Sequence, residues 1–402
     1  MGWPSGWAEV CRTLHAGSIP APISMTSEYL RKTKHMINLN PLQTGGLLTA
    51  AARRMLMEWG DGYSICDFCR GKLDEIRNPP IYEFVHHDLP EFIGADIVRL
   101  TNGAREGIFT IMHAVTKPGD TIVVDENAHY STFVAAERAK LKIQKIANSG
   151  YPKYIIDIKA YEHVIKALEK QKIKVKLLII TYPDGNYGNL PDVRLLSKIA
   201  ANYDIPLIIN AAYAIGRMPV NVNDIGADFI VASGHKSMAS AGPIGFIGMK
   251  KKWEKTLLRI SQFFKNKEIE MLGCTARGPS LLTMMASFRH VRERVKHWNN
   301  QIEKAQWFSR EMGKIEIRQL GEKPHMHDVM FFESEKLYEI SKHHKNGAFY
   351  LYHEFKKNNI WGIKPGLTKY FKLSTFTATR EELATVIDTF KSLVSSRSRL
   401  TG

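Results

Sequence analysis

The chain has 402 residues, 44% of them hydrophobic, and carries a formal net charge of +16 at pH 7. This length allows two or three domains, and the lack of any run of about 20 apolar residues predicts a protein that does not cross a membrane. The basic excess favours a polyanionic partner, and the four cysteines are too few for a disulfide scaffold, which favours a reducing, cytoplasmic location.

The first 80 residues are interpreted as an N-terminal segment that carries a Cys-x-x-Cys pair, Cys66 and Cys69. The following part of the chain alternates between short apolar runs and helical patterns. Such alternation predicts an α/β domain over residues 81–290, with a mostly parallel central sheet and functional sites at the strand ends. The helical patterns follow the turn at 101–107 and cover 192–203, and the predicted strands are 121–125, 175–181, 205–210 and 228–232.

From about residue 280 a long helical pattern runs through Val291 and Trp298 to Met312. Mixed short elements follow, and a last helix is predicted near 380–395. This order predicts a smaller C-terminal α/β domain over residues 291–402, which a long helix joins to the larger domain.

The motif Ser233-Gly234-His235-Lys236 directly follows the strand predicted at 228–232, and a glycine-rich turn follows at 241–245. A lysine at a strand end can form a Schiff base with an aldehyde cofactor, and its polar neighbours can hold the phosphate of that cofactor. A lone lysine in a polar loop would be an ordinary surface residue. The flanking pattern favours the cofactor-binding interpretation.

Three further positions fit the same interpretation. Ala104 and Arg105 begin a helix after a glycine turn, and the free amides of a helix N-terminus bind phosphate. His129 follows the strand at 121–125, where its ring can stack on a flat heteroaromatic ring, and Asn210 ends the strand at 205–210, where it can meet a ring heteroatom. Taken singly, these are also what an ordinary glycine turn and a packing histidine look like.

Together these motifs resemble the pyridoxal-phosphate enzymes of fold type I, in the branch of class V aminotransferases and cysteine desulfurases. The resemblance covers residues 80–290 and implies that fold, pyridoxal 5′-phosphate as cofactor, and cofactor contacts from residues 104, 105, 129, 210 and 233–236. One departure is informative, because most of that superfamily has aspartate where Asn210 stands. A neutral amide cannot hold the ring proton by charge, which suits the loss of a good β-leaving group and counts against transamination.

Four segments are more specific, and over residues 37–300 they resemble the archaeal O-phosphoseryl-tRNA:cysteinyl-tRNA synthases. The segments are GDGYSICDFC at 60–69, TNGARE at 101–106, DGNYGN at 184–189 and LGCTAR at 272–277. The resemblance implies a homodimeric, tRNA-dependent sulfur transferase that replaces the phosphate of O-phosphoseryl-tRNA(Cys) by sulfur. It implies catalytic roles for Lys236 and His129, and the phosphoseryl-tRNA synthetase that supplies the substrate as a partner.

Cys66, Cys69 and Cys274 allow several interpretations. A Cys-x-x-Cys pair can be redox-active, carry a persulfide or form half of a metal site, to which His86 or His87 can add a ligand. The cysteines can also be inert. In the resembled family the corresponding three cysteines handle sulfur, through a persulfide or an iron–sulfur cluster. The sequence does not choose between these two roles.

Two other functions fit the sequence less well than this one. A cysteine desulfurase acting on a free amino acid shares the lysine and the histidine, but it needs a carboxylate-binding arginine in the C-terminal domain. It explains neither the net charge nor Asn210. An RNA-binding scaffold with a degenerate cofactor fold is disfavoured by the intact lysine motif.

Overall fold

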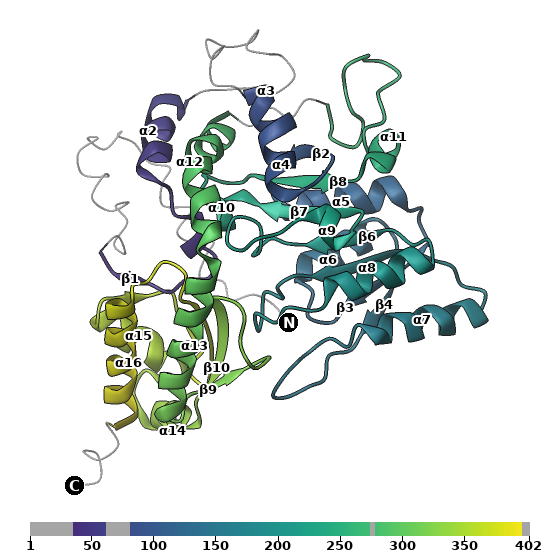
Figure 1. Cartoon of the computed structure of the whole chain (residues 1–402). Coiled ribbons are helices and arrows are strands. Elements are labelled where there is room, and N and C mark those ends of the chain that lie inside the picture. Colours follow the sequence, from purple (N-terminus) through teal and green to yellow (C-terminus); the bar gives the residue numbers. More distant parts are fainter. Residues whose placement is uncertain (1–34, 62–80, 274–277, 396–402) are drawn as a thin grey trace, which may run out of the picture. The chain divides into compact units, whose positions relative to one another are not determined.

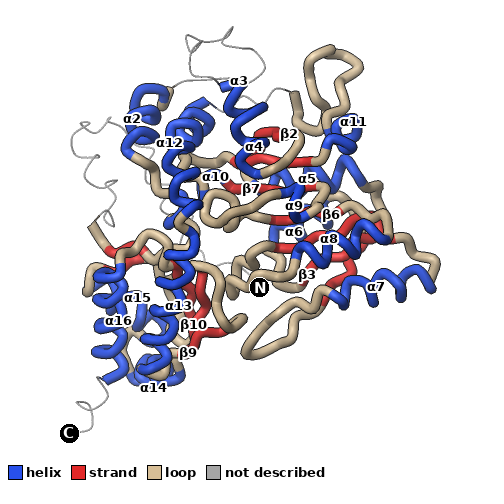
Figure 2. Tube along the Cα trace, viewed as in Figure 1, coloured by secondary structure: helices blue, strands red, loops and turns tan. Residues whose placement is uncertain are grey.

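The computed structural model describes residues 35–61, 81–273 and 278–395. Every helix and strand in the described ranges lies within residues 37–395. The largest element is a seven-stranded sheet in the order β2-β8-β7-β6-β5-β3-β4 (Figures 1 and 2). Its strands are β2 (Ile97–Thr101), β3 (Thr121–Asp125), β4 (Lys142–Ile146), β5 (Val175–Thr181), β6 (Leu207–Asn210), β7 (Phe229–Ser233) and β8 (Gly245–Met249).

Strands β4, β3, β5, β6 and β7 run parallel, and β8 is antiparallel to both of its neighbours, β7 and β2. The central strands are almost continuous runs of Val, Leu and Ile, as expected for parallel strands that are covered on both faces. The predicted α/β architecture with a mostly parallel sheet is confirmed.

Helices cover the two faces of this sheet. Alternate strand residues point to opposite faces, so Val123 and Ile209 join one apolar core, whereas Ile122 and Ile208 join another. The first core packs against α4, α7 and α8, and the second against α5, α6 and α11. No helix of the described ranges is both long and apolar enough to cross a membrane. The helices of this part are α2 (Ala50–Trp59), α3 (Ile81–Glu83), α4 (Leu89–Ile93), α5 (Ala104–Val115), α6 (Tyr130–Arg138), α7 (Lys159–Lys170), α8 (Val193–Asn202), α9 (Val222–Ile225), α10 (Gly234–Ser237), α11 (Glu254–Leu257) and α12 (Gly278–Lys296).

The four predicted strands correspond to β3, β5, β6 and β7, but the sequence interpretation missed β2, β4 and β8. Strand β4, at the edge of the sheet, reads Lys-Ile-Gln-Lys-Ile with its three polar side chains exposed, so it lacks the apolar run of a central strand. Strand β8 contains Gly245 and Gly248, and glycines at this spacing are also typical of a turn. Gly248 is needed inside the sheet because a Cβ atom there would lie 2.5 Å from Ile93 and 2.9 Å from Ile230.

A second, antiparallel sheet lies toward the C-terminus, in the order β12-β10-β9. One face of it, with Phe332 and Phe371, packs into a separate apolar core together with α13 and α16. The N-terminal segment contributes to this core, because Leu39 is buried in it and β1 pairs with β11. The elements of this part are β1 (Ile37–Asn38), β9 (Arg318–Leu320), β10 (Val329–Glu333), β11 (Ile360–Trp361), β12 (Tyr370–Ser374), α13 (Trp298–Lys314), α14 (Glu335–His343), α15 (Tyr350–Lys357) and α16 (Arg380–Ser395).

The single long helix predicted from about 280 to Met312 is wrong in one respect, because the structure breaks it at His297. The helix α12 ends at Lys296 and α13 begins at Trp298, and His297 between them has a φ of −94° and a ψ of 23°. The break lies where the chain passes from one core to the other. Trp298 is still packed in the core of the large sheet, whereas Phe308 belongs to the C-terminal core.

Candidate active site

A cavity of about 950 Å³ lies at the carboxyl ends of the parallel strands, which is where open α/β sheets bind ligands. Strands β5, β6 and β7, the N-terminus of α5 and the segment 361–372 all contribute to its wall. The cavity brings together most of the residues predicted from sequence, although they are far apart along the chain: Ala104, Arg105, His129, Asn210, Ser233, His235 and Lys236.

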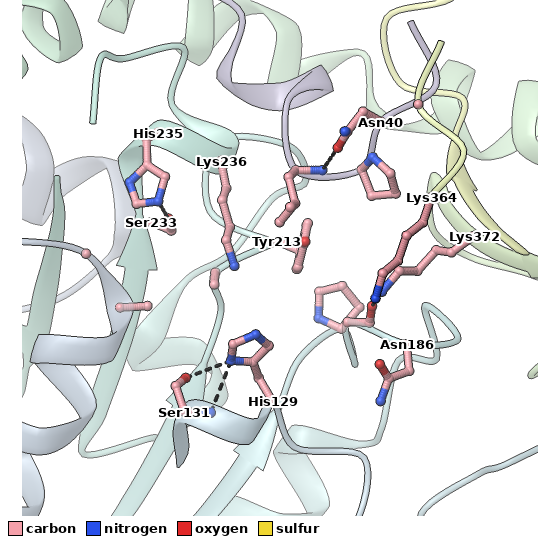
Figure 3. A pocket seen from close by; sticks show the side chains of 18 of the residues that line it. Asn40, His129, Ser131, Asn186, Tyr213, Ser233, His235, Lys236, Lys364 and Lys372 are labelled. Atoms are coloured by element: carbon pink, nitrogen blue, oxygen red, sulfur yellow. Dashed lines mark hydrogen bonds between the residues drawn. The ribbon is translucent and has the colours of Figure 1, made fainter. Parts of the chain in front are cut away.

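Lys236 lies on the short helix α10, directly after β7, and Figure 3 shows its side chain extending into the cavity toward His129. Its Nζ atom is 4.8 Å from the centre of the Tyr213 ring. Burial, and then the positive charges of Arg105, Arg217 and Lys372, lower the pKa of the Lys236 amine to about 8. A fraction of the amine is therefore unprotonated near neutral pH, which is the form that attacks a carbonyl group.

His129 is the N-cap residue of α6, and its ring is fixed by Ser131. The Nδ1 atom accepts a hydrogen bond from the Ser131 backbone amide at 3.3 Å and lies 2.7 Å from the Ser131 hydroxyl (Figure 3). Burial, followed by the charges of Lys236 and Arg105, lowers the pKa of the imidazole to about 4. The ring is therefore neutral at physiological pH and can present a flat, uncharged face to a ligand.

The start of α5, with Gly103 before it, lies at the cavity wall and presents free backbone amides there. Gly103 has a φ of 105°, and a Cβ atom there would lie 3.2 Å from the His235 ring, so glycine is required by both conformation and space. Ala104 and Arg105 follow on the first turn of a 12-residue helix, where backbone amides are free to bind an anion. The His235 ring is held by the Ile244 carbonyl at 3.1 Å and lies 3.4 Å from the Ser233 hydroxyl.

These residues fit pyridoxal phosphate. The α5 cradle with Arg105, Ser233 and His235 would hold the phosphate group, and the neutral ring of His129 would cover the pyridine ring. Asn210, at the end of β6, is buried and lines the cavity. Its amide would meet the ring nitrogen, while Lys236 supplies the amine. The cavity volume is at the upper end of the usual range for small-molecule sites, so it also leaves room for a substrate.

The described part of the cavity wall is rich in cations and contains no acidic side chain. Among its described residues are Arg105, Lys236, Lys364 and Lys372, and none is Asp or Glu. No carboxylate in the described ranges forms an ion pair with any of these four side chains. This composition favours ligands that carry several negative charges.

The residues behind the Ser233–Lys236 motif form a fully buried polar junction between the two sheets. Arg217 and Asp328 are completely buried, with 2.6 Å between Nη1 and Oδ2. The Nη2 group of Arg217 also donates to the backbone carbonyls of Pro41 and Lys236, at 2.8 and 3.1 Å. The Arg217 guanidinium, which does not line the cavity, thus fixes the backbone of Lys236 from behind. The sequence analysis did not predict this role of Arg217.

Other predicted residues lie elsewhere. Gly234 is not part of the cavity wall, because it is buried and a Cβ atom there would meet Ile244 and Ser240 at 2.8 Å. Cys66, Cys69 and Cys274 lie outside the described residues. Within the described ranges, no cluster of three or more His, Cys, Asp or Glu side chains is arranged to hold a metal ion.

Among the cavity residues that were missed, Tyr213 carried a usable signal and two lysines carried none. Tyr213 follows Asn210 by three residues, so the strand end itself pointed to it. Lys364 and Lys372 come from the C-terminal sheet and its preceding loop, and nothing local distinguishes them from other lysines of a basic chain. The residues that the C-terminal part contributes to the described cavity wall include these two lysines and no arginine.

Comparison with known proteins places this site in context. Residues 60–395 match the family model described as O-phosphoseryl-tRNA(Sec) selenium transferase, SepSecS. The O-phospho-L-seryl-tRNA:Cys-tRNA synthase of Methanosarcina acetivorans is 52% identical over 365 residues, which cover 90% of this chain and 95% of the relative. The protein of the same name from Methanocaldococcus jannaschii is 46% identical over 365 residues, covering 90% of this chain and 97% of the relative.

Solved structures agree with these matches. A chain in the crystal structure of the SepCysS–SepCysE N-terminal domain complex is 43% identical, with a TM-score of 0.87, covering 94% of this chain and 99% of that one. A cysteine desulfurase from Thermococcus onnurineus NA1 is 18% identical, with a TM-score of 0.74 and coverage of 95% and 100%, which shows a common fold. The predicted fold class, that of the fold type I pyridoxal-phosphate enzymes, is confirmed.

Proposed function

The chain belongs to the SepSecS family and, within it, to the O-phospho-L-seryl-tRNA:Cys-tRNA synthases, and from this premise we propose that it converts O-phosphoseryl-tRNA(Cys) to cysteinyl-tRNA(Cys). In this reaction phosphate leaves the β-carbon of the aminoacyl group and sulfur takes its place. With sulfur at the level of sulfide the exchange is redox-neutral, whereas a persulfide donor requires two electrons from a thiol reductant. The enzyme is a pyridoxal-phosphate-dependent transferase.

Pyridoxal phosphate, when bound, makes the α-hydrogen of an amino acid acidic enough for a β-substituent to leave. Lys236 is the residue proposed to carry the cofactor and to take the α-proton at Nζ. The lowered pKa of its amine, about 8, supports this role, because an unprotonated base is available near neutral pH. His129 is proposed to orient the ring plane, and residues 104, 105 and 233–236 to anchor the cofactor, with Asn210 at the ring nitrogen.

The observation that carries this proposal is the cavity itself, which combines Lys236 with three further cationic side chains and no acidic side chain among its described residues. A substrate with a phosphate on its side chain and RNA in place of a free carboxylate matches such a wall. The test is conversion of purified O-phosphoseryl-tRNA(Cys) by the cofactor-loaded enzyme with a sulfide donor. We expect cysteinyl-tRNA and inorganic phosphate in equal amounts, and no product from seryl-tRNA(Cys).

A cysteine desulfurase would give a different result in the same assay. It would release alanine from free cysteine and leave O-phosphoseryl-tRNA(Cys) unchanged. Efficient alanine release without phosphate release would replace the proposed function by this alternative. The lack of an arginine in the C-terminal part of the described cavity wall argues against it, because a free α-carboxylate would then have no bidentate partner there.

Cys66, Cys69 and Cys274 are proposed to handle the sulfur, through a persulfide or an iron–sulfur cluster. Thiolates near the reacting β-carbon would supply the nucleophilic form of sulfur. Replacing any one of them by serine should reduce the yield of cysteinyl-tRNA with a physiological donor but leave phosphate release largely intact. Normal yields from all three variants would make the cysteines bystanders. Bulk sulfide has to be excluded, because it can add without a protein thiol.

The proposed assembly is a homodimer in the cytoplasm, with O-phosphoseryl-tRNA(Cys) and its synthetase as partners. Large apolar side chains that lie open to solvent in the single chain support a further protein contact. Met57 is 87% exposed, and Phe263 and Leu272 are 88% and 89% exposed. Mixing a Lys236→Ala variant with a Cys66→Ser variant should restore activity only where each site combines residues of two subunits. A fully active monomer in sedimentation would exclude the dimer.

A further inference from the structure

Two lysines of the C-terminal part form one wall of the cavity, away from the phosphate cradle at α5. In Figure 3, Lys236 lies between Ser233 and His235 on one side and Lys364 and Lys372 on the other. Lys372 lies on β12 and is half-buried, while Lys364 belongs to the loop between β11 and β12. The cofactor interpretation uses neither of them.

Lys372 is held in place at this wall. Its Nζ donates a hydrogen bond to the backbone carbonyl of Gly185, with 2.6 Å between the two atoms. Its neighbour across the sheet on β10 is Phe331, which also lines the cavity. A neutral carbonyl satisfies one of the three protons of an ammonium group and leaves the other two for a ligand.

The side chains of Lys364 and Lys372 lie side by side at this wall (Figure 3). Burial lowers the pKa of Lys372; the charge of Asp184 opposes this, and the smaller effect of the Lys364 charge lowers it further. Asp184 is buried and accepts hydrogen bonds from the backbone amides of Asn186, Tyr187 and Asn189, so its carboxylate is engaged by its own loop. Two like charges gathered at a cavity wall are unfavourable until an anion lies between them.

We infer that Lys364 and Lys372 form a second anion subsite, which takes the phosphate monoester on the side chain of the substrate. This inference rests on the proposed function and adds the residues that recognise the leaving group. At pH 7 a phosphate monoester carries a charge of about −1.5 to −2, which a pair of lysines matches. The subsite would hold the phosphate across Lys236 from the cofactor phosphate, and it would stabilise the charge that the leaving group keeps when the C–O bond breaks.

The subsite explains a choice between substrates. Seryl-tRNA lacks the phosphate, so it would leave the two lysines without an anion and would bind less tightly. Removing one charge-assisted hydrogen bond is expected to weaken phosphate binding about tenfold. The two lysines could instead bind a phosphate of the RNA backbone. In that case their loss would also weaken the binding of tRNA that carries no amino acid.

The experiment uses the cofactor-loaded enzyme, in which the α5 cradle is filled, and inorganic phosphate as the probe. Equilibrium dialysis with radioactive phosphate is compared for wild type, Lys364→Gln, Lys372→Gln and the double variant. The matched control is Lys369→Gln, which removes the same charge from a side chain that pairs with Glu335 and does not line the cavity. We expect phosphate affinity to fall about tenfold in each single variant, to fall further in the double variant and to stay unchanged in the control.

Binding of uncharged tRNA(Cys) to the same proteins separates the two sources of phosphate. Unchanged tRNA affinity together with reduced phosphate affinity assigns the lysines to the side-chain phosphate. Equal reduction of both, or phosphate affinity unchanged in the double variant, would overturn the inference. A Lys372→Arg variant, which keeps the charge, should retain phosphate binding and so excludes simple misfolding. The proposed function is tested separately, by the conversion assay. If the wild type failed to convert O-phosphoseryl-tRNA(Cys), that function would be refuted, whatever the phosphate-binding result.

Discussion

The cavity and the polar junction behind it differ in how their positively charged side chains are paired. In the junction, Arg217 is completely buried, faces Asp328 at 2.6 Å and donates further hydrogen bonds to backbone carbonyls. In the cavity, Lys236 and Lys364 have no ion-pair partner among the described residues, and Lys372 has one carbonyl. The two regions are joined by the backbone of Lys236, which belongs to both.

This difference separates structural from ligand-binding charge. A buried guanidinium that is fully paired fixes the position of its neighbours, and breaking the pair costs folding free energy. Cations that remain unpaired at a cavity wall weaken the folded state slightly and gain their partners only when an anionic ligand binds. The lowered pKa of Lys236 comes from this second arrangement, because burial and its cationic neighbours both disfavour the charged amine.

The largest effect is expected from unpairing the junction. Asp328→Asn removes the charge opposite Arg217 and leaves a guanidinium that is buried without a counterion. We expect the free energy of unfolding to fall by about 3–5 kcal/mol, measured by urea denaturation. The matched control is Asp388→Asn, which removes one partner of the exposed pair with Lys391 and should change stability little. Equal, small changes in both variants would show that the junction is not a structural ion pair.

A smaller effect follows from the amine of Lys236. Only the unprotonated amine attacks the aldehyde, so the rate at which cofactor-free protein captures pyridoxal phosphate should rise about tenfold per pH unit below 8 and level off above it. The Arg105→Gln variant should move this midpoint upward, because Arg105 is one of the charges that lower the pKa of Lys236. Stopped-flow absorbance measures the rate. A midpoint near 10.5 in the wild type would mean that the cavity does not perturb the amine.

The smallest effect, counted for each phosphate group bound, is that of salt on the affinity for tRNA. If the basic surface binds tRNA, the logarithm of the affinity should fall linearly with the logarithm of salt concentration, with a slope of about −0.9 per duplex phosphate bound. A fourfold rise in salt then weakens the affinity about 3.5-fold per phosphate. The Arg217–Asp328 pair should respond far less, since buried pairs are weakly screened. If tRNA binding did not depend on salt, the net charge of +16 would no longer support an RNA substrate.

The sequence indicated many residues that the structure brings together on one side of the cavity, because they lie at the ends of apolar strands that are easy to recognise. Asn210 ends one predicted strand, and Ser233 and Lys236 follow the end of another; parallel strands bring their carboxyl ends together. The helix start at Ala104 was also predicted, since a glycine turn before an apolar helical pattern is a local signal.

The other half of the site could not be predicted in this way. Lys364 and Lys372 reach the cavity only because the C-terminal sheet lies against it, and the proximity of two segments that are far apart in sequence leaves no local pattern. The Arg217–Asp328 pair has the same origin. Strand β8 was missed because its glycines, which serve close packing inside the sheet, look like turn residues in the sequence.

The most direct test of the central claim is a single-turnover measurement of phosphate release from O-phosphoseryl-tRNA(Cys) without any sulfur donor. If the unpaired amine of Lys236 and the cationic cavity drive the loss of phosphate, the cofactor-loaded wild type should release one phosphate per active site. The Lys236→Ala variant should release none, and a variant lacking all three cysteines Cys66, Cys69 and Cys274 should release it normally. Undiminished phosphate release by Lys236→Ala, or no release by the wild type until sulfur is supplied, would contradict the account.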